Sequence, residues 1–78
     1  MKTKKELIGY TLTILADKPP VRARNGMFEL EMMDLENNSK TYIVLVTRID
    51  INNILNIPNH RFTFKDVGKD YPEVTKLD

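Results

Sequence analysis

The chain has 78 residues, no cysteine and a net charge of +1 from 12 basic and 11 acidic side chains. This length allows one domain with a single modest core, and the absence of cysteine excludes disulfides, zinc–thiolate sites and thiol chemistry. Dedicated nucleic-acid-binding proteins usually carry a large positive excess, so the near-neutral charge lowers that expectation, although binding needs only a local patch. No apolar run approaches the roughly 20 residues that span a bilayer, and residues 1–8 lack a signal-peptide pattern. These features predict a soluble, cytoplasmic protein with no membrane contact.

Residues 3–20 combine a weak helix signal with a strand. Thr3 and Glu6 have the spacing of a capping box, so this stretch is either one helical turn or a solvated basic tail. The pattern then changes to period two, which favours a half-buried strand. Its inward face would hold Ile8, Tyr10, Leu12 and Ile14. The Pro19-Pro20 pair ends the strand, since proline cannot donate to a ladder, and indicates a sheet edge or a loop.

Residues 21–34 predict a β-hairpin centred on Asn25-Gly26, a dipeptide that tolerates the positive φ angles of a type I′ turn. A two-residue loop would place Arg22 opposite Glu29, a pair typically worth about 0.2–1 kcal/mol in a sheet. The same register collects a mixed set of side chains on one outward face: Arg22, Arg24, Met27, Glu29, Glu31 and Met33. It places the apolar set on the opposite face, toward the core: Val21, Ala23, Phe28, Leu30 and Met32.

The rest of the chain predicts two further strands and one short helix. Residues 41–47 are apolar on both faces, which indicates a strand that is covered on both sides or lies at the centre of a barrel. Asp50 can N-cap a helix of one or two turns that ends before Pro58. Residues 61–65 alternate, with the two phenylalanines inward. We therefore predict one domain over residues 1–68 and a partly ordered tail over residues 69–78.

The order of these elements predicts the fold class. Five short antiparallel strands in so small a chain tend to curl into a barrel, which removes exposed edges. A short helical turn before the last strand is the layout of SH3-like barrels, whereas OB-folds usually place their helix between the third and fourth strands. The prediction is a mostly-β domain with a five-stranded antiparallel sheet curled into an SH3-like barrel.

The sequence contains no recognisable catalytic, cofactor or metal motif. His60, the only histidine, opens a strand and has no orienting acid or further ligands at a suitable spacing. Ser39, the only serine, lies in a polar loop, and the three glycines are isolated from one another. We therefore expect no enzymatic activity, no cofactor and no metal.

The mixed outward face predicts a protein-binding module. Methionine and arginine are enriched at interfaces, and methionine adapts to irregular surfaces. We expect these six residues to bind a protein partner or a second copy of the chain, as in a phage-type inhibitor or regulator that blocks a host enzyme sterically. Three alternatives stay open. A curled barrel would bury Met27 and Met33; a structural or assembly subunit would use the same surface for oligomerisation; and a nucleic-acid-binding barrel would use Lys18, Arg22, Arg24, Arg61 and Lys65.

Overall fold

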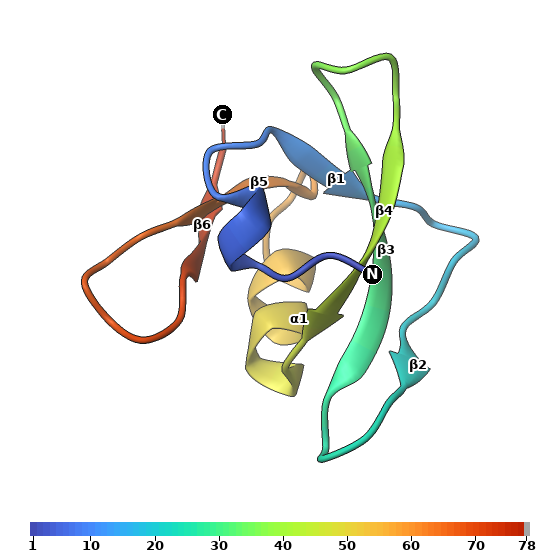
Figure 1. The fold of residues 1–78 in the computed structure, drawn as a ribbon. Coiled ribbons are helices and arrows are strands. Elements are labelled where there is room, and N and C mark those ends of the chain that lie inside the picture. Colours follow the sequence, from blue (N-terminus) through green and yellow to red (C-terminus); the bar gives the residue numbers. More distant parts are fainter. Residues whose placement is uncertain (78) are drawn as a thin grey trace.

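The computed structural model, which describes residues 1–77, contains one six-stranded antiparallel sheet and one short α-helix (Figure 1). The elements in chain order are η1 (Lys5–Leu7), β1 (Leu12–Ile14), β2 (Val21–Arg22), β3 (Phe28–Asp34), β4 (Thr41–Val46), α1 (Arg48–Leu55), β5 (Arg61–Lys65) and β6 (Glu73–Lys76). The predicted mostly-β class with one short helix is confirmed. Within residues 1–77, no helix has the length and apolar character needed to cross a membrane.

Strand β3 organises the sheet. One edge of β3 pairs with β4, from Phe28 opposite Val46 to Met33 opposite Thr41. The other edge pairs with β2 near its start and with β1 near its end, and the sheet continues from β1 through β5 to β6.

The sheet is not closed into a barrel. Strands β4 and β6 do not pair with each other over the described residues. The helix α1 lies in the space between the β3–β4 ribbon and the β5–β6 hairpin (Figure 1) and contacts β6. The predicted closed SH3-like barrel is therefore not confirmed, because the helix keeps the two ends of the sheet apart.

The core lies on the side of the sheet that faces α1. Alternate residues of a strand point to one face, and β3 and β4 accordingly bury Leu30 and Val44 opposite each other. Phe62 and Phe64 of β5 are fully buried and meet edge to face, with ring centroids 5.6 Å apart. The whole buried apolar set is Leu7, Leu12, Leu30, Met32, Val44, Val46, Ile54, Ile57, Phe62 and Phe64.

The Asn25-Gly26 turn forms as predicted, but the register of the hairpin differs from the predicted register. Asn25 and Gly26 have φ angles of 58° and 72°, and the Met27 amide donates to the Arg24 carbonyl at 3.1 Å. The Ala23 amide also donates to the Met27 carbonyl, at 2.9 Å. Two residues of the first strand therefore stand opposite one residue of the second, which is the geometry of a β-bulge.

The bulge shifts the pairing by one residue. Val21 stands opposite Glu29, and Arg22 stands opposite Phe28. Because a shift of one residue exchanges the two faces of a strand, Arg22 leaves the face that carries Glu29. The predicted Arg22–Glu29 pair is therefore wrong.

The first nine residues form a strap across the open side of the sheet. The Lys2 amide donates to the Ile43 carbonyl at 2.9 Å, which covers part of the free edge of β4. Thr3 and Glu6 exchange backbone-to-side-chain hydrogen bonds, so the one-turn interpretation is confirmed, in the form of η1. Gly9, with a φ of 88°, breaks the predicted alternation. Leu7 is therefore buried in the core, whereas Ile8, which was predicted to face inward, is exposed.

Two further differences concern the second half of the chain. The N-cap of α1 is Thr47, whose hydroxyl accepts from the Asp50 amide; Asp50 is the third helical residue of the capping box rather than the cap itself. Strand β6, which the polar sequence of residues 69–78 did not predict, pairs with β5 from Phe62 opposite Lys76 to Lys65 opposite Glu73. Residues 73–76 of the expected tail therefore belong to the sheet, and Asp78 lies outside the described residues.

Candidate protein-binding face

The side of β2, β3 and β4 that points away from the core presents a continuous set of side chains. The register aligns Val21, Glu29 and Leu45 in one row across the three strands. The next rows place Glu31 beside Ile43 and Met33 beside Thr41. We define the outer face by the six side chains that are apolar or acidic in these rows: Val21, Glu29, Glu31, Met33, Ile43 and Leu45.

Two apolar residues of the outer face are strongly exposed. Val21 is 60% exposed and Ile43 is 47% exposed, while the other four members of the face are half-buried. Residues 41–47 were predicted to be covered on both sides or to lie at the centre of a barrel, yet only the side toward the core is buried in the part of the chain that the structure describes. Among the described strands, β4 pairs only with β3 and therefore lies at an edge of the sheet.

The centre of the outer face is a ridge between two hollows. One hollow, of about 200 Å³, is lined by Lys18, Pro19, Val21, Glu29, Glu31 and Ile43. The other, of about 390 Å³, is lined by Met1, Lys2, Glu31, Lys40, Thr41, Tyr42 and Ile43. Glu31 and Ile43 belong to both linings, so these two side chains stand between the hollows. A surface with a ridge and flanking hollows offers shape for a complementary protein to fit.

The charge at the centre of the outer face is negative. Over residues 1–77, the ion pairs are Lys2–Glu6, Lys4–Asp50 and Lys69–Glu73, and none of them includes Glu29 or Glu31. Both carboxylates are half-buried among apolar neighbours. Lys18 lines the same hollow but forms no ion pair with either glutamate.

The structure keeps three of the six predicted site residues together. Glu29, Glu31 and Met33 share the outer face because they alternate along β3. The exposed Arg22 is paired with Phe28, and the exposed Arg24 lies in the turn. Met27 is half-buried and lines a separate cavity beside Lys4, Tyr71 and Val74.

Sequence reasoning missed the apolar half of the outer face, which consists of Val21, Ile43 and Leu45. For Ile43 and Leu45 a signal was present in the sequence, because β4 is apolar on both of its faces. Val21 was assigned to the core, because the predicted register did not include the bulge.

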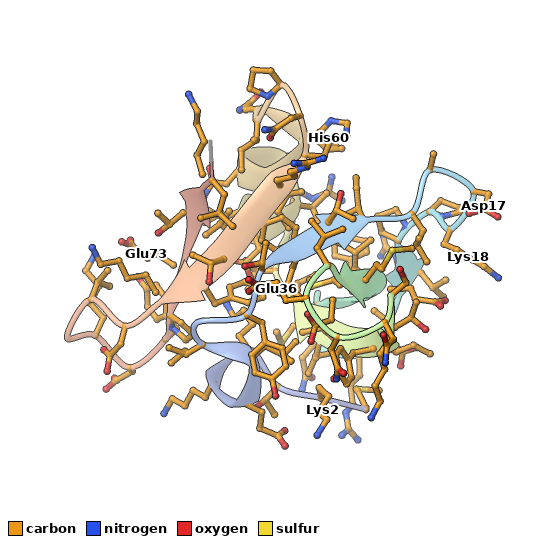
Figure 2. All side chains as sticks on the ribbon, turned by 90° about the horizontal axis from the view of Figure 1, so that it is seen from above. Lys2, Asp17, Lys18, Glu36, His60 and Glu73 are labelled. Carbon is orange, nitrogen blue, oxygen red and sulfur yellow. The ribbon has the colours of Figure 1, made fainter. Side chains whose placement is uncertain are left out.

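The predicted basic set does not converge. Arg61 aligns across β1 with Met33, whereas Arg22 aligns with Phe28. These positions are five residues apart along β3, or about 16 Å at roughly 3.3 Å per residue. Figure 2 shows charged side chains dispersed around the molecule, with Lys18 and Glu73 on opposite sides.

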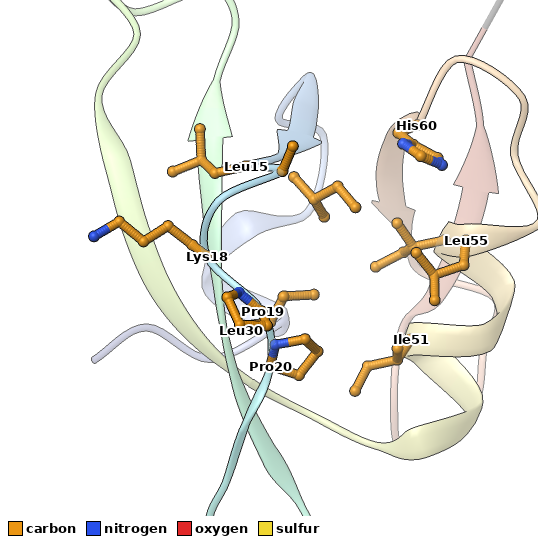
Figure 3. A pocket seen from close by; sticks show the side chains of 11 residues that line it. Leu15, Lys18, Pro19, Pro20, Leu30, Ile51, Leu55 and His60 are labelled. Atoms are coloured by element: carbon orange, nitrogen blue, oxygen red, sulfur yellow. The ribbon is translucent and has the colours of Figure 1, made fainter.

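The apolar cavity between α1 and the β1–β2 connection contains the only histidine. It encloses about 310 Å³, and its lining includes Leu15, Pro20, Leu55 and His60, while Lys18 points away from it (Figure 3). His60 has a φ of 56° and donates its backbone amide to the Ile57 carbonyl. Residues 1–77 contain no group of three or more His, Cys, Asp or Glu side chains arranged to hold a metal ion.

A second charged cluster fixes the strap to the helix. The Lys4 ammonium lies 2.7 Å from the Asp50 carboxylate, and the two side chains are only 11% and 8% exposed. The same Asp50 oxygen accepts from the Thr47 amide at 2.9 Å, and Lys4 lies over the Tyr71 ring at 5.7 Å. These contacts are all satisfied within the fold, which gives the cluster a structural role.

Glu6 is the group for which we expect a pH-dependent contribution to stability. The Thr3 backbone amide and hydroxyl donate to its carboxylate at 2.9 and 3.1 Å, and these bonds hold the pKa of Glu6 below its ordinary value of 4.5. Because the folded pKa is lower than the unfolded one, this contribution is present above the unfolded pKa and is lost as pH falls through the folded pKa. An NMR titration of the Glu6 carboxyl should give a midpoint below 4.5, rising in Thr3→Ala; a midpoint at or above the ordinary value would contradict these bonds.

Comparisons with known proteins give no relative: no protein-family model, curated protein or solved structure matches the chain. A functional proposal therefore depends on the register, exposure and charge of the outer face.

Proposed function

We propose that this chain is a non-enzymatic protein-binding module that docks through its outer face. The observation that carries the proposal is the pair of exposed apolar side chains, Val21 and Ile43, on a paired sheet at 60% and 47% exposure. The two side chains line one hollow together with Glu29 and Glu31, and exposed apolar surface beside polar groups is typical of interaction sites. Complete burial of one fully exposed aliphatic side chain of this size contributes about 1.5–3 kcal/mol. At 60% and 47% exposure, Val21 and Ile43 would each gain roughly half of that on binding.

The setting of the face favours binding with little reorganisation. Val21 is held by pairing between β2 and β3, and Ile43 by pairing between β3 and β4 on one side and the Lys2 strap on the other. Side chains fixed in this way lose less conformational entropy on association than side chains on a mobile loop. The outer face therefore needs little rearrangement to bind a partner.

The size of the molecule suits a steric mechanism. A standard interface buries about 800 Å² on each partner, and the total accessible surface here is 5238 Å². A standard contact would thus use roughly 15% of the surface. The remaining bulk, with extents of 32 × 31 × 23 Å, would cover the neighbouring surface of the partner. Blocking of an enzyme, as by a phage-type inhibitor, is the form of this function that we propose.

The two alternative functions have less support. A nucleic-acid-binding module needs clustered basic side chains, whereas the five candidate residues are dispersed and the outer face is acidic at its centre. An assembly subunit would show concentration-dependent oligomerisation on a sizing column.

Ile43→Asp should abolish partner capture from a lysate of the organism of origin, because the substitution places a third carboxylate in the apolar part of the face. The matched control is Ile49→Asp, which makes the same chemical change at a 70% exposed residue of α1. Capture is measured by nuclease-treated affinity purification and mass spectrometry. We expect the wild type and Ile49→Asp to retain a common protein at least tenfold better than Ile43→Asp; equal capture by all three would refute the proposed docking face.

A further inference from the structure

We infer that the outer face recognises a basic, apolar protein segment, in which two Lys or Arg side chains stand at alternate positions of an extended strand and aliphatic side chains flank them on the same side. This inference rests on the proposed function and adds the chemistry of the partner to it. It follows from where the two glutamates lie relative to the apolar anchors.

The glutamates cannot be avoided by a partner that covers the anchors. Glu29 stands between Val21 and Leu45 in one row, and Glu31 stands beside Ile43 in the next. A protein that removes Val21 and Ile43 from water must therefore also cover both carboxylates. Covering a carboxylate without a cation or hydrogen-bond donors costs several kcal/mol. The partner must therefore supply hydrogen-bond donors at these positions, and the cationic donors of Lys and Arg also supply the complementary charge.

The chain does not supply that charge itself. Glu29 and Glu31 form no ion pair within residues 1–77, and the Lys2 ammonium is placed toward Glu6 and the Tyr42 ring. Lys18 and Lys40 line the hollows on the two sides, and neither forms an ion pair with these carboxylates. Two acidic positions at the centre of an otherwise apolar face are left for an external cation.

The same charges decide between possible occupants. A second copy docked face to face about a two-fold axis would bring the acidic centres together, and like charges at an interface cost several kcal/mol. Phosphate groups of a nucleic acid would meet the same repulsion. A basic protein segment is the occupant whose charge complements the face.

The spacing indicates the form of the segment. Glu29 and Glu31 are alternate residues of one strand, so their positions are separated by about 6.6 Å along β3. Alternate residues of an extended partner strand have the same spacing. The residue between its basic positions points to the opposite side of the partner strand. Contacts with the apolar members of the face would therefore come from residues two positions before or after the basic pair, which lie on the same side as that pair.

The test combines charge variants with cross-linking in the full chain. We expect Glu29→Lys/Glu31→Lys to reduce capture of the partner more than a hundredfold, and Glu29→Gln/Glu31→Gln, which preserves side-chain shape, to reduce it at least tenfold. The matched control is Asp70→Lys, in the exposed β5–β6 loop, with no change expected. Circular dichroism melting confirms that each variant is folded.

A photoreactive residue at Thr41, exposed beside Met33, identifies the contacting segment. We expect a cross-linked partner peptide with at least two alternating Lys or Arg residues, and Lys→Glu changes there should restore binding to the Glu29→Lys/Glu31→Lys variant. A peptide without basic residues, a peptide from a second copy of this chain, or full capture by both charge variants would overturn the inference. If the inference is overturned but Ile43→Asp still abolishes capture, the proposed docking through the outer face stands. If Ile43→Asp also leaves capture unchanged, the proposed function and the inference are both wrong.

Discussion

Asp50→Ala is expected to lower the free energy of unfolding by about 3–5 kcal/mol, because it leaves a buried charge without its partner. The Lys4 side chain is 11% exposed, and its ammonium lies 2.7 Å from the Asp50 carboxylate. The substitution also removes the acceptor for the Thr47 amide and hence half of the capping box of α1. Urea unfolding followed by circular dichroism measures the loss.

The double variant Lys4→Met/Asp50→Ala is the control for this prediction. It removes the unpaired ammonium and replaces it with an apolar side chain, and such replacements of buried pairs are often close to neutral. We therefore expect the double variant to be more stable than Asp50→Ala alone. A loss below about 1 kcal/mol for Asp50→Ala, or a double variant less stable than the single one, would show that the pair behaves as a solvated surface contact.

Phe62→Ala should lower the free energy of unfolding by about 3–5 kcal/mol through lost burial and a residual cavity. Phe62 is fully buried and packs edge to face on Phe64. A chain of this length has a total stability of roughly 4–12 kcal/mol, so the variant should be partly unfolded at 37 °C. The measurement is thermal unfolding by differential scanning calorimetry.

Val67→Ala provides the surface control for the Phe62 variant. Val67 is 38% exposed in the β5–β6 loop and is not a member of the buried core. Its truncation should change the stability by no more than about 0.5 kcal/mol. Losses of equal size at the two positions would contradict the assignment of β5 to the centre of the core.

The parts of the fold that depend on local patterns were predictable from the sequence. Alternation identified β3 and β5 and placed the two phenylalanines inward, and Asn25-Gly26 located the turn. The signal for α1 was also present, since Thr47 and Asp50 have the spacing of a capping box, but Asp50 was taken as the cap. In each case the relevant physical interaction lies within a few residues of the chain.

The parts that depend on tertiary context were not predictable in this way. The bulge at Ala23 and Arg24 adds one residue to one strand of the hairpin, and the turn sequence alone does not report it. Strand β6 is short and polar and forms because β5 offers an edge to pair with. The sheet stays open because α1 lies between its two ends, which is a property of packing rather than of any one segment.

The error in the hairpin register shaped the candidate site. A one-residue error in register assigned Arg22 to the outer face and Val21 to the core, so the predicted face was more basic and less apolar than the observed one. The observed face retains Glu29, Glu31 and Met33 and gains Val21, Ile43 and Leu45. The proposal of a protein partner survives this exchange, while its expected chemistry changes from mixed charge to an acidic, apolar surface.

Methyl NMR of the labelled chain, free and bound to the captured partner, tests the central claim most directly. Docking through the outer face predicts that cross-saturation from the unlabelled partner reaches the methyl groups of Val21, Met33, Ile43 and Leu45. The methyl groups of Ile49 and Leu55, which are 70% and 54% exposed on α1, should remain unaffected. Saturation of Ile49 and Leu55 with none at Val21 and Ile43 would contradict the account and move the binding surface to the helix.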